Sequence, residues 1–149
     1  MQTFLPYSDF KMSAKVLDVK RLGKQRVECL QILKCLKKGE FICQFPPKRT
    51  PWYNHPAVRM WKGYESGLLA YMLEICNEWK FRGYKDTCYE KVLEVVAPPL
   101  TVELLPNWIE DESFHLSHKS NLLRKNEKHY SQFFIGIPND LPYKWPINK

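Results

Sequence analysis

The sequence lacks the long apolar runs that mark membrane-spanning and secreted proteins. Its most apolar run, residues 68–76, is already broken by Glu74, so it is too short and too polar to cross a bilayer. The opening residues M-Q-T-F-L-P have neither the basic start nor the apolar centre of a secretion signal. We therefore expect a cytoplasmic protein, associated with a nucleoid or present in a nucleus that it reaches by diffusion.

Glycine is scarce, and the motifs that depend on it are missing. None of the six glycines belongs to a phosphate-cradling loop or to a G-x-S-x-G turn, which argues against nucleotide hydrolysis and serine hydrolase chemistry. The five cysteines are odd in number and no pair has the C-x-x-C spacing of a zinc or redox site. We expect reduced thiols that mostly pack in the core.

A metal site has one candidate. His115 and His118 are three residues apart, a spacing that could hold a metal with His129 as a third ligand, which leaves a His-metal nuclease as a minor alternative. No glutamate stands at the metalloprotease spacing and no paired cysteines accompany these histidines. We therefore expect neither a metal nor another cofactor.

Positive charge is what the chain has in excess. Its 149 residues carry 23 Lys and Arg against 16 Asp and Glu, a net charge of +7, which favours an anionic partner such as nucleic acid. No composition shift or repeat divides the chain, so we expect one domain over residues 1–149. No heptad seam asks for a dimer, so we expect a monomer.

Apolar residues recur mainly at helical spacing, which predicts a mostly α fold: a compact, single-domain helical bundle with long proline-rich loops. The loop 40–54 is basic and carries aromatic residues, so it either contacts phosphates and stacks on bases or is a surface connection whose tryptophan folds back on the core. The first expected helical segment runs from Ser8 or Asp9 through about Leu17, and the next stretch continues the helix to Lys38 with Gly39 as the stop. Further helices are expected from Asn54 to Arg82 and from about Glu110 to Phe134, and residues 88–96 form a short helix or a strand.

The stretch Arg21–Glu28 stands out because it places one carboxylate among three cations within a helical pattern. On a helix, Arg26 falls on the apolar stripe, so it needs a partner or lines a cleft, unless it snorkels from a solvated face. Gly23 within the pattern indicates close approach of another backbone. Glu28 is the chief candidate for a catalytic acid. In the last helix Lys119, Arg124 and Lys125 are candidate phosphate contacts, or a cationic solvated face.

Three motifs together resemble one enzyme family. They are R-L-G-K-Q-R-V-E, then N-H-P-A-V-R-M-W-K-G-Y with E-W-K-F-R-G-Y, and F-H-L-S-H-K-S-N-L-L-R-K-N-E-K-H-Y. The chain is similar to the pyrimidine dimer DNA glycosylases of the endonuclease V type, in particular to a bacterial and viral branch that begins M-Q-T-F-L-P. The resemblance implies a helical domain that kinks double-stranded DNA, flips a nucleotide out, cuts the glycosidic bond and then cuts the strand.

The same resemblance implies roles for individual residues. In the family an N-terminal threonine amine attacks the sugar and forms an imine, assisted by a glutamate that follows an arginine. Here these two residues would be Glu28 and Arg26, although the family's adjacent Arg-Glu has become Arg-Val-Glu. The residues expected at the same DNA-binding cleft are Arg21, Lys24, Gln25, His55, His118, Lys119, Arg124, Lys125 and Tyr130.

The N-terminus departs from the family pattern. Gln2 is too large for the usual removal of methionine, and Thr3 comes one position later than the family's threonine. Three alternatives follow: the amine of Met1 serves as nucleophile, Thr3 is exposed by other processing, or this branch has lost the imine chemistry. We expect a glycosylase that removes a damaged or modified pyrimidine, with a non-catalytic nucleic-acid-binding protein as the main rival.

Overall fold

The computed structural model describes residues 2–40, 54–95 and 105–146. Within these ranges the chain forms seven α-helices and one short 3-10 helix, and no strand, which confirms the expected mostly helical fold. The predicted basic loop lies almost wholly outside the described residues. No helix in the described part of the chain is long and apolar enough to span a membrane.

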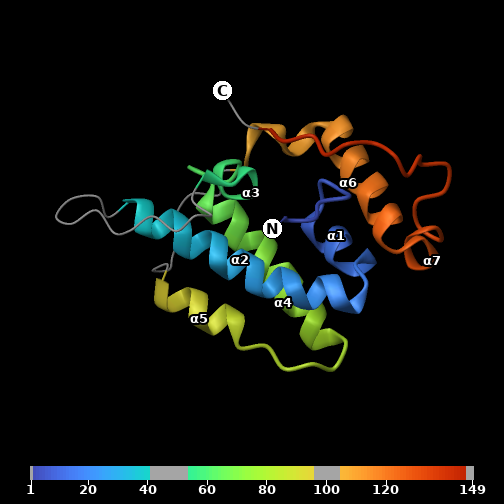
Figure 1. Ribbon diagram of the computed structural model, residues 1–149. Coiled ribbons are helices and arrows are strands. Elements are labelled where there is room, and N and C mark those ends of the chain that lie inside the picture. The colour runs from blue at the N-terminus through green and yellow to red at the C-terminus, as the bar shows by residue number, and fades with distance from the viewer. Residues whose placement is uncertain (1, 41–53, 96–104, 147–149) are drawn as a thin grey trace.

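Two long helices form the centre of the molecule (Figure 1). Helix α2 covers Val19–Glu40 and packs along α4, which covers Glu65–Phe81. Helix α1, Phe10–Val16, lies against α4, and α5, Cys88–Val95, lies against α2. The apolar stripes of the long helices drive this packing, because each removes about 25 cal/mol of unfavourable hydration per Å² of apolar surface buried. Fully or almost fully buried side chains on these stripes are Leu22, Cys29, Leu33, Leu68, Met72 and Ile75.

Some of the expected helices are interrupted at positions that the spacing of apolar residues alone does not reveal. Leu17 is extended, with a ψ of 137°, and separates α1 from α2. Gly63 has a φ of 86° and separates α3, Pro56–Arg59, from α4, so the expected helix from Asn54 to Arg82 is two helices. Gly39 lies inside α2 and does not end it. Residues 88–95, for which a helix and a strand were both open, are helical.

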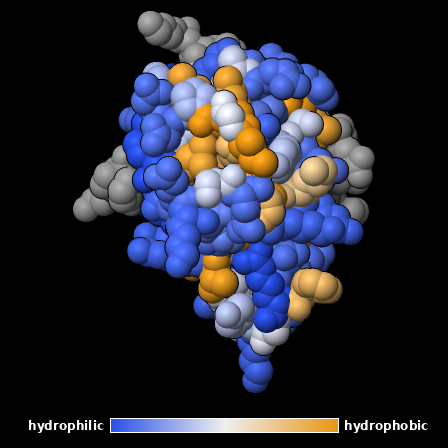
Figure 2. Space-filling model, turned by 90° about the vertical axis from the view of Figure 1, so that its right-hand side faces the viewer, coloured by the Kyte–Doolittle hydropathy of each residue, from blue (hydrophilic) through white to orange (hydrophobic). Residues whose placement is uncertain are grey.

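The C-terminal third packs across one end of this helical core. The 3-10 helix Asn107–Glu110 leads into α6, Glu112–Lys125, and then α7, Glu127–Tyr130. Asn126 interrupts the last helix and caps α7, since its side chain accepts from the amide of His129. The chain then returns in extended form along α6 (Figure 1). Figure 2 shows the face on the right-hand side of Figure 1, which is mostly hydrophilic, with a larger apolar patch in its upper half and smaller separate ones below.

The N-terminal segment, residues 2–6, is buried although it is neither helix nor strand. Side chains from three helices satisfy its main chain. The amide of Phe4 donates to Gln25 of α2 at 3.0 Å, the amide of Leu5 donates to Nδ1 of His118 in α6 at 2.9 Å, and Tyr71 of α4 donates to the carbonyl of Phe4 at 2.7 Å. Because buried main-chain groups need partners, these side chains fix the path of the segment.

Candidate active site

A pocket of about 310 Å³ opens where the N-terminal segment crosses the first half of α2. Four cations and a single carboxylate are among the residues around it, so its charge is suited to an anionic ligand. Five residues that the sequence predicts for one cleft are brought together here. The complete lining is Gln2, Phe4, Lys20, Arg21, Lys24, Gln25, Glu28, Lys125 and Tyr143.

The carboxylate of Glu28 is half-buried and is held from the side of the N-terminal segment. Its Oε2 accepts from Nε2 of Gln25 at 2.9 Å and, over a longer 3.4 Å, from the main-chain amide of Gln2. Glu28 is therefore oriented at the pocket by one neighbour on its own helix and by one from the start of the chain.

The cations come from two helices. Lys20 and Lys24 are exposed on successive turns of α2, and Lys125 is exposed at the end of α6. Arg21 lies between them and pairs with Asp18 at 3.1 Å, which leaves it less free to turn toward a ligand. Lys20 was not among the residues predicted from the sequence, although its position four residues before Lys24 places both side chains on the same face of the helix.

Tyr143 reaches the pocket from the far end of the chain. Burial raises the pKa of its phenol to about 12, although Arg124 and Arg21 act in the opposite direction, so it is a neutral hydrogen-bond donor at physiological pH. Its ring lies edge-on to His118, with ring centres 5.6 Å apart. Nothing in the local sequence marks this tyrosine, because only the return of the chain along α6 places it here.

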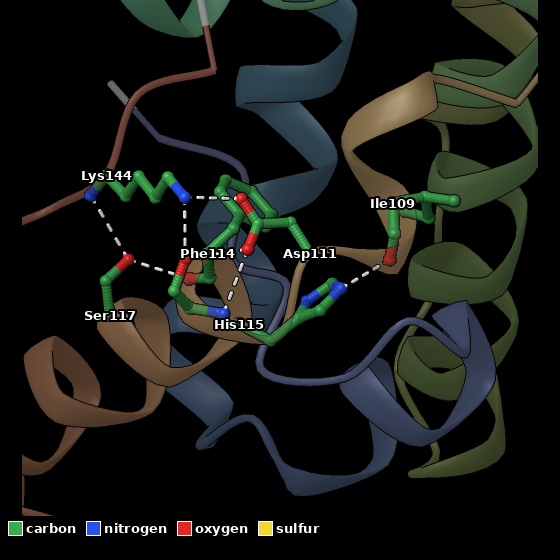
Figure 3. A network of polar contacts seen from close by, with 7 residues as sticks. Ile109, Asp111, Phe114, His115, Ser117 and Lys144 are labelled. Atoms are coloured by element: carbon green, nitrogen blue, oxygen red, sulfur yellow. Dashed lines mark hydrogen bonds and ion pairs between the residues drawn. The ribbon is translucent and has the colours of Figure 1, made fainter.

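The C-terminal segment, residues 139–146, is held on α6 by side chains. Lys144 donates from its amide to Ser117 at 3.2 Å, and its ammonium reaches Asp111 and Ser113, each at 2.6 Å (Figure 3). The hydrogen bond from Lys144 is the main reason that the pKa of Asp111 is lowered to about 2. Arg124 donates to the carbonyl of Leu141 at 3.1 Å.

Arg26 has the partner that an inward-facing arginine requires, but it does not line the pocket. Its guanidinium pairs with Asp86 at 2.8 Å and lies 4.3 Å from the centre of the Trp79 ring, on the side of α4 and α5. Burial acts to raise the pKa of Asp86, but hydrogen bonds from Arg26 and from the amides of Tyr89 and Cys88 outweigh it and lower that pKa. Two residues along a helix turn the side chain by about 200°, so Arg26 and Glu28 face different ways.

Because Gly23 has no side chain, the Trp79 ring can lie against α2 at this position. A Cβ built on it would lie 3.0 Å from the Trp79 ring, so the close approach expected at this glycine is made by a side chain and not by another backbone.

The histidines of α6 are structural. His118 is fully buried, and Nδ1 accepts from the amide of Leu5, so it faces the core and not DNA. Burial lowers its pKa to about 3, with a further contribution from His115. The ring nitrogens of His115 lie 2.7 Å and 2.6 Å from the carbonyls of Leu5 and Ile109. His129 contacts the carbonyl of Val16. Among the described residues no group of three potential ligands is placed to hold a metal.

Four further residues predicted for the DNA-binding cleft lie elsewhere. Tyr130 is buried and bonds to the amide and carboxylate of Asp18, which is a correction to its expected role. Arg124 is engaged by the C-terminal segment, and the ammonium of Lys119 lies 4.8 Å from the ring centre of Tyr7. His55 caps α3 and contacts Trp145.

Of the two candidate nucleophiles, Thr3 lies within the residues that the structure describes and Met1 does not. Thr3 is fully buried, and its hydroxyl accepts from the indole of Trp61 at 3.0 Å, so it does not line the pocket. Exposing its amine would remove Gln2, whose main chain contacts both Glu28 and Gln25. Met1 lies outside the described residues.

Comparison with known proteins places this chain in a family. A family model described as pyrimidine dimer DNA glycosylase matches residues 1–91, which is more than half of the chain. The chain belongs to the pyrimidine dimer DNA glycosylase family. This confirms the family inferred from the motifs, and with it the broad class of an enzyme that acts on DNA. The range matched to the glycosylase family contains Gln2, Gln25 and Glu28, whereas Lys125 and Tyr143 lie beyond it. No curated protein and no solved structure matches the chain.

Proposed function

We propose that the protein removes a damaged or modified pyrimidine from double-stranded DNA, with the pyrimidine dimer as the first candidate lesion and Glu28 as the catalytic carboxylate. The observation that carries this proposal is the pocket itself, in which one oriented carboxylate is surrounded by four cations. The enzyme acts as a monomer wherever the DNA is held, in a nucleoid or a nucleus.

The cations and the carboxylate have separate tasks. Lys20, Lys24 and Lys125 bind phosphates on either side of the lesion, which supplies affinity without reading sequence. A nucleotide flipped out of the duplex then enters the pocket beside Glu28. As the bond to the base breaks, positive charge develops on the sugar, and the ionised carboxylate stabilises it.

We further propose an imine route with strand cleavage. The main-chain nitrogen of Gln2 lies 3.4 Å from the carboxylate of Glu28. If Met1 supplies the α-amine, that amine belongs to the residue directly before this nitrogen in the chain. An α-amine titrates near pH 8, so a useful fraction is an unprotonated nucleophile at neutral pH. It forms a bond to C1′ of the sugar as the bond from C1′ to the base breaks, and the base leaves with a proton. The C1′–O4′ bond then opens as the nitrogen loses its protons, which gives the imine, and removal of a C2′ proton expels the 3′ phosphate.

Borohydride trapping tests both levels of the proposal. The protein is mixed with ultraviolet-irradiated and abasic-site duplexes and reduced, and the adduct is located by mass spectrometry. An adduct on the N-terminal peptide supports the imine route and identifies the residue that supplies the amine. Base release without an adduct means that water is the nucleophile. If neither appears on any of these substrates, dimer glycosylase activity is refuted.

The substitution Glu28→Gln distinguishes the proposed enzyme from the rival function, a non-catalytic protein that binds DNA. We expect turnover to fall about 10²- to 10⁴-fold, the usual contribution of a positioned acid or base, while DNA affinity is kept or rises slightly because one negative charge is gone. Glu90→Gln, which removes an exposed carboxylate on α5, is the matched control and should leave both unchanged. A pure binding protein has no turnover to lose.

A further inference from the structure

Gln25 is the residue through which the parts of the pocket are joined. It is fully buried on α2, and all four hydrogen-bonding positions of its carboxamide are occupied. Its Nε2 donates to the carbonyl of Gln2 at 2.7 Å and to Oε2 of Glu28 at 2.9 Å. Its Oε1 lies 3.0 Å from the amide of Phe4 and 2.8 Å from the hydroxyl of Tyr71.

These contacts leave the amide one orientation. A main-chain N–H must meet the oxygen of the carboxamide, and a carbonyl and a carboxylate must meet its nitrogen, so a flipped amide would lose these bonds and oppose like groups. Tyr71 shares its single proton between Gln25 and the carbonyl of Phe4, from the side away from Glu28. The contacts of its oxygen with Phe4 and Tyr71 therefore fix the Gln25 amide. Its nitrogen in turn fixes the carbonyl of Gln2 and the carboxylate of Glu28.

Two groups that the proposed chemistry needs are held by this one nitrogen. Gln25 orients the carboxylate of Glu28, and it also fixes the carbonyl of Gln2, whose own amide approaches the same carboxylate oxygen. The path of the N-terminal segment and the direction of Glu28 are thus set together. A displacement of about 1 Å between reacting groups is enough to cost on the order of 100-fold in rate.

We propose that Gln25 is a positioning residue that aligns Glu28 with the start of the chain, and that it does not bind DNA. This inference rests on the proposed function of Glu28. It changes the role expected from the sequence, where Gln25 was grouped with the DNA-binding residues. A residue that acts only by positioning should affect kcat and leave KM and the affinity for DNA nearly unchanged.

Two substitutions test the proposal. Gln25→Glu has the same shape and keeps the oxygen that faces Phe4, but it loses both donors. Gln25→Met keeps the length and removes every polar contact. We expect each to lower kcat on irradiated duplex about 100-fold, with KM and the dissociation constant for DNA within about twofold of wild type. If Gln25→Met fails to fold, Gln25→Glu alone carries the measurement.

A double-mutant cycle separates positioning from general weakening of the fold. In a Glu28→Gln background, adding Gln25→Met should lower the residual turnover much less than the about 100-fold expected in the wild-type background, because no carboxylate is left to orient and only the N-terminal segment still depends on Gln25. Ser13→Ala is the matched control. Its buried hydroxyl accepts from the amide of Tyr7 at 3.1 Å and donates to the carbonyl of Tyr7 at 3.0 Å, so it tethers the chain just beyond the N-terminal segment, away from the pocket. It should lower the melting temperature and leave kcat per folded molecule at the wild-type value.

Two results would overturn the inference while the proposed function stands. One is wild-type kcat per folded molecule in both Gln25 variants. The other is a loss of turnover that adds fully to that of Glu28→Gln. A wild-type protein that releases no base from irradiated, abasic or modified duplexes overturns the proposed function, and the positioning role with it.

Discussion

At the scale of single residues, Arg26 and Asp86 form the most buried ion pair in the described part of the chain, with side chains 15% and 2% exposed. Asp86→Asn leaves the guanidinium without its counter-charge, which costs about 3–5 kcal/mol for a pair of this kind. Urea unfolding should show this loss at neutral pH. Because the pKa of Asp86 is lowered in the folded state, its contribution is present above about pH 4 and disappears as the pH falls through the folded value. The mutant and wild-type stabilities should therefore converge in acid, and a constant difference down to pH 2 would contradict the argument.

His118 also makes the folded state less stable as the pH falls, but over a higher pH range than Asp86. Its pKa is about 3 in the folded protein against 6.5 for an ordinary histidine, so below pH 6.5 the unfolded chain takes up a proton that the folded one refuses. The folded state should lose about 2 kcal/mol between pH 7 and pH 5 from this residue alone. His118→Gln should flatten the pH dependence of urea unfolding by that amount. An unchanged slope would mean that His118 is charged in the folded state.

Among the structural elements, the C-terminal segment is held by side chains and by no helix or sheet of its own. Arg124→Met removes donors to the carbonyls of Asn139 and Leu141, and hydrogen exchange at the amide of Leu141 should accelerate about fivefold, as expected for loss of roughly 1 kcal/mol. Lys125→Met, one residue along, is the matched control and should leave this exchange rate unchanged. Equal acceleration in both variants would mean that helix fraying at the end of α6 controls the segment.

The helices could be predicted from the sequence, but their ends could not. Helices follow from local periodicity, whereas some helix ends involve contacts between residues that are far apart in the chain. Apolar periodicity is local and shows α2, α4 and α6 directly. At the break between α1 and α2, the amide of Asp18 donates to the hydroxyl of Tyr130, which lies 112 residues away. The junction at Gly63 was missed for another reason, since a glycine inside an apolar pattern is compatible with a continuous helix.

For the whole molecule, the site was predicted to the extent that it lies on one helix. Arg21, Lys24, Gln25 and Glu28 are close together because helical geometry requires it, and this follows from spacing alone. Tyr143 and the tie between Gln2 and Glu28 come from chain segments that meet only in the folded molecule. The motif favoured Arg26 over Lys20, but on α2 the first faces Asp86 and the second lines the pocket.

The charge of the whole protein gives the last prediction. A chain of net charge +7 binds any DNA to some extent, so affinity alone does not locate the interface. Each lysine that contacts a phosphate contributes about 0.9 to the slope of log K against log salt. Lys20→Met, Lys24→Met and Lys125→Met should each reduce that slope by about this amount.

Lys91→Met is the matched control, because it removes the same charge from an exposed position on α5 that does not line the pocket. It should lower affinity slightly through the general field and leave the slope within error. Equal changes for Lys91 and the three pocket lysines would show that DNA is bound diffusely by net charge. A change confined to Lys20, Lys24 and Lys125 would place the phosphates at the rim of the pocket that contains Glu28.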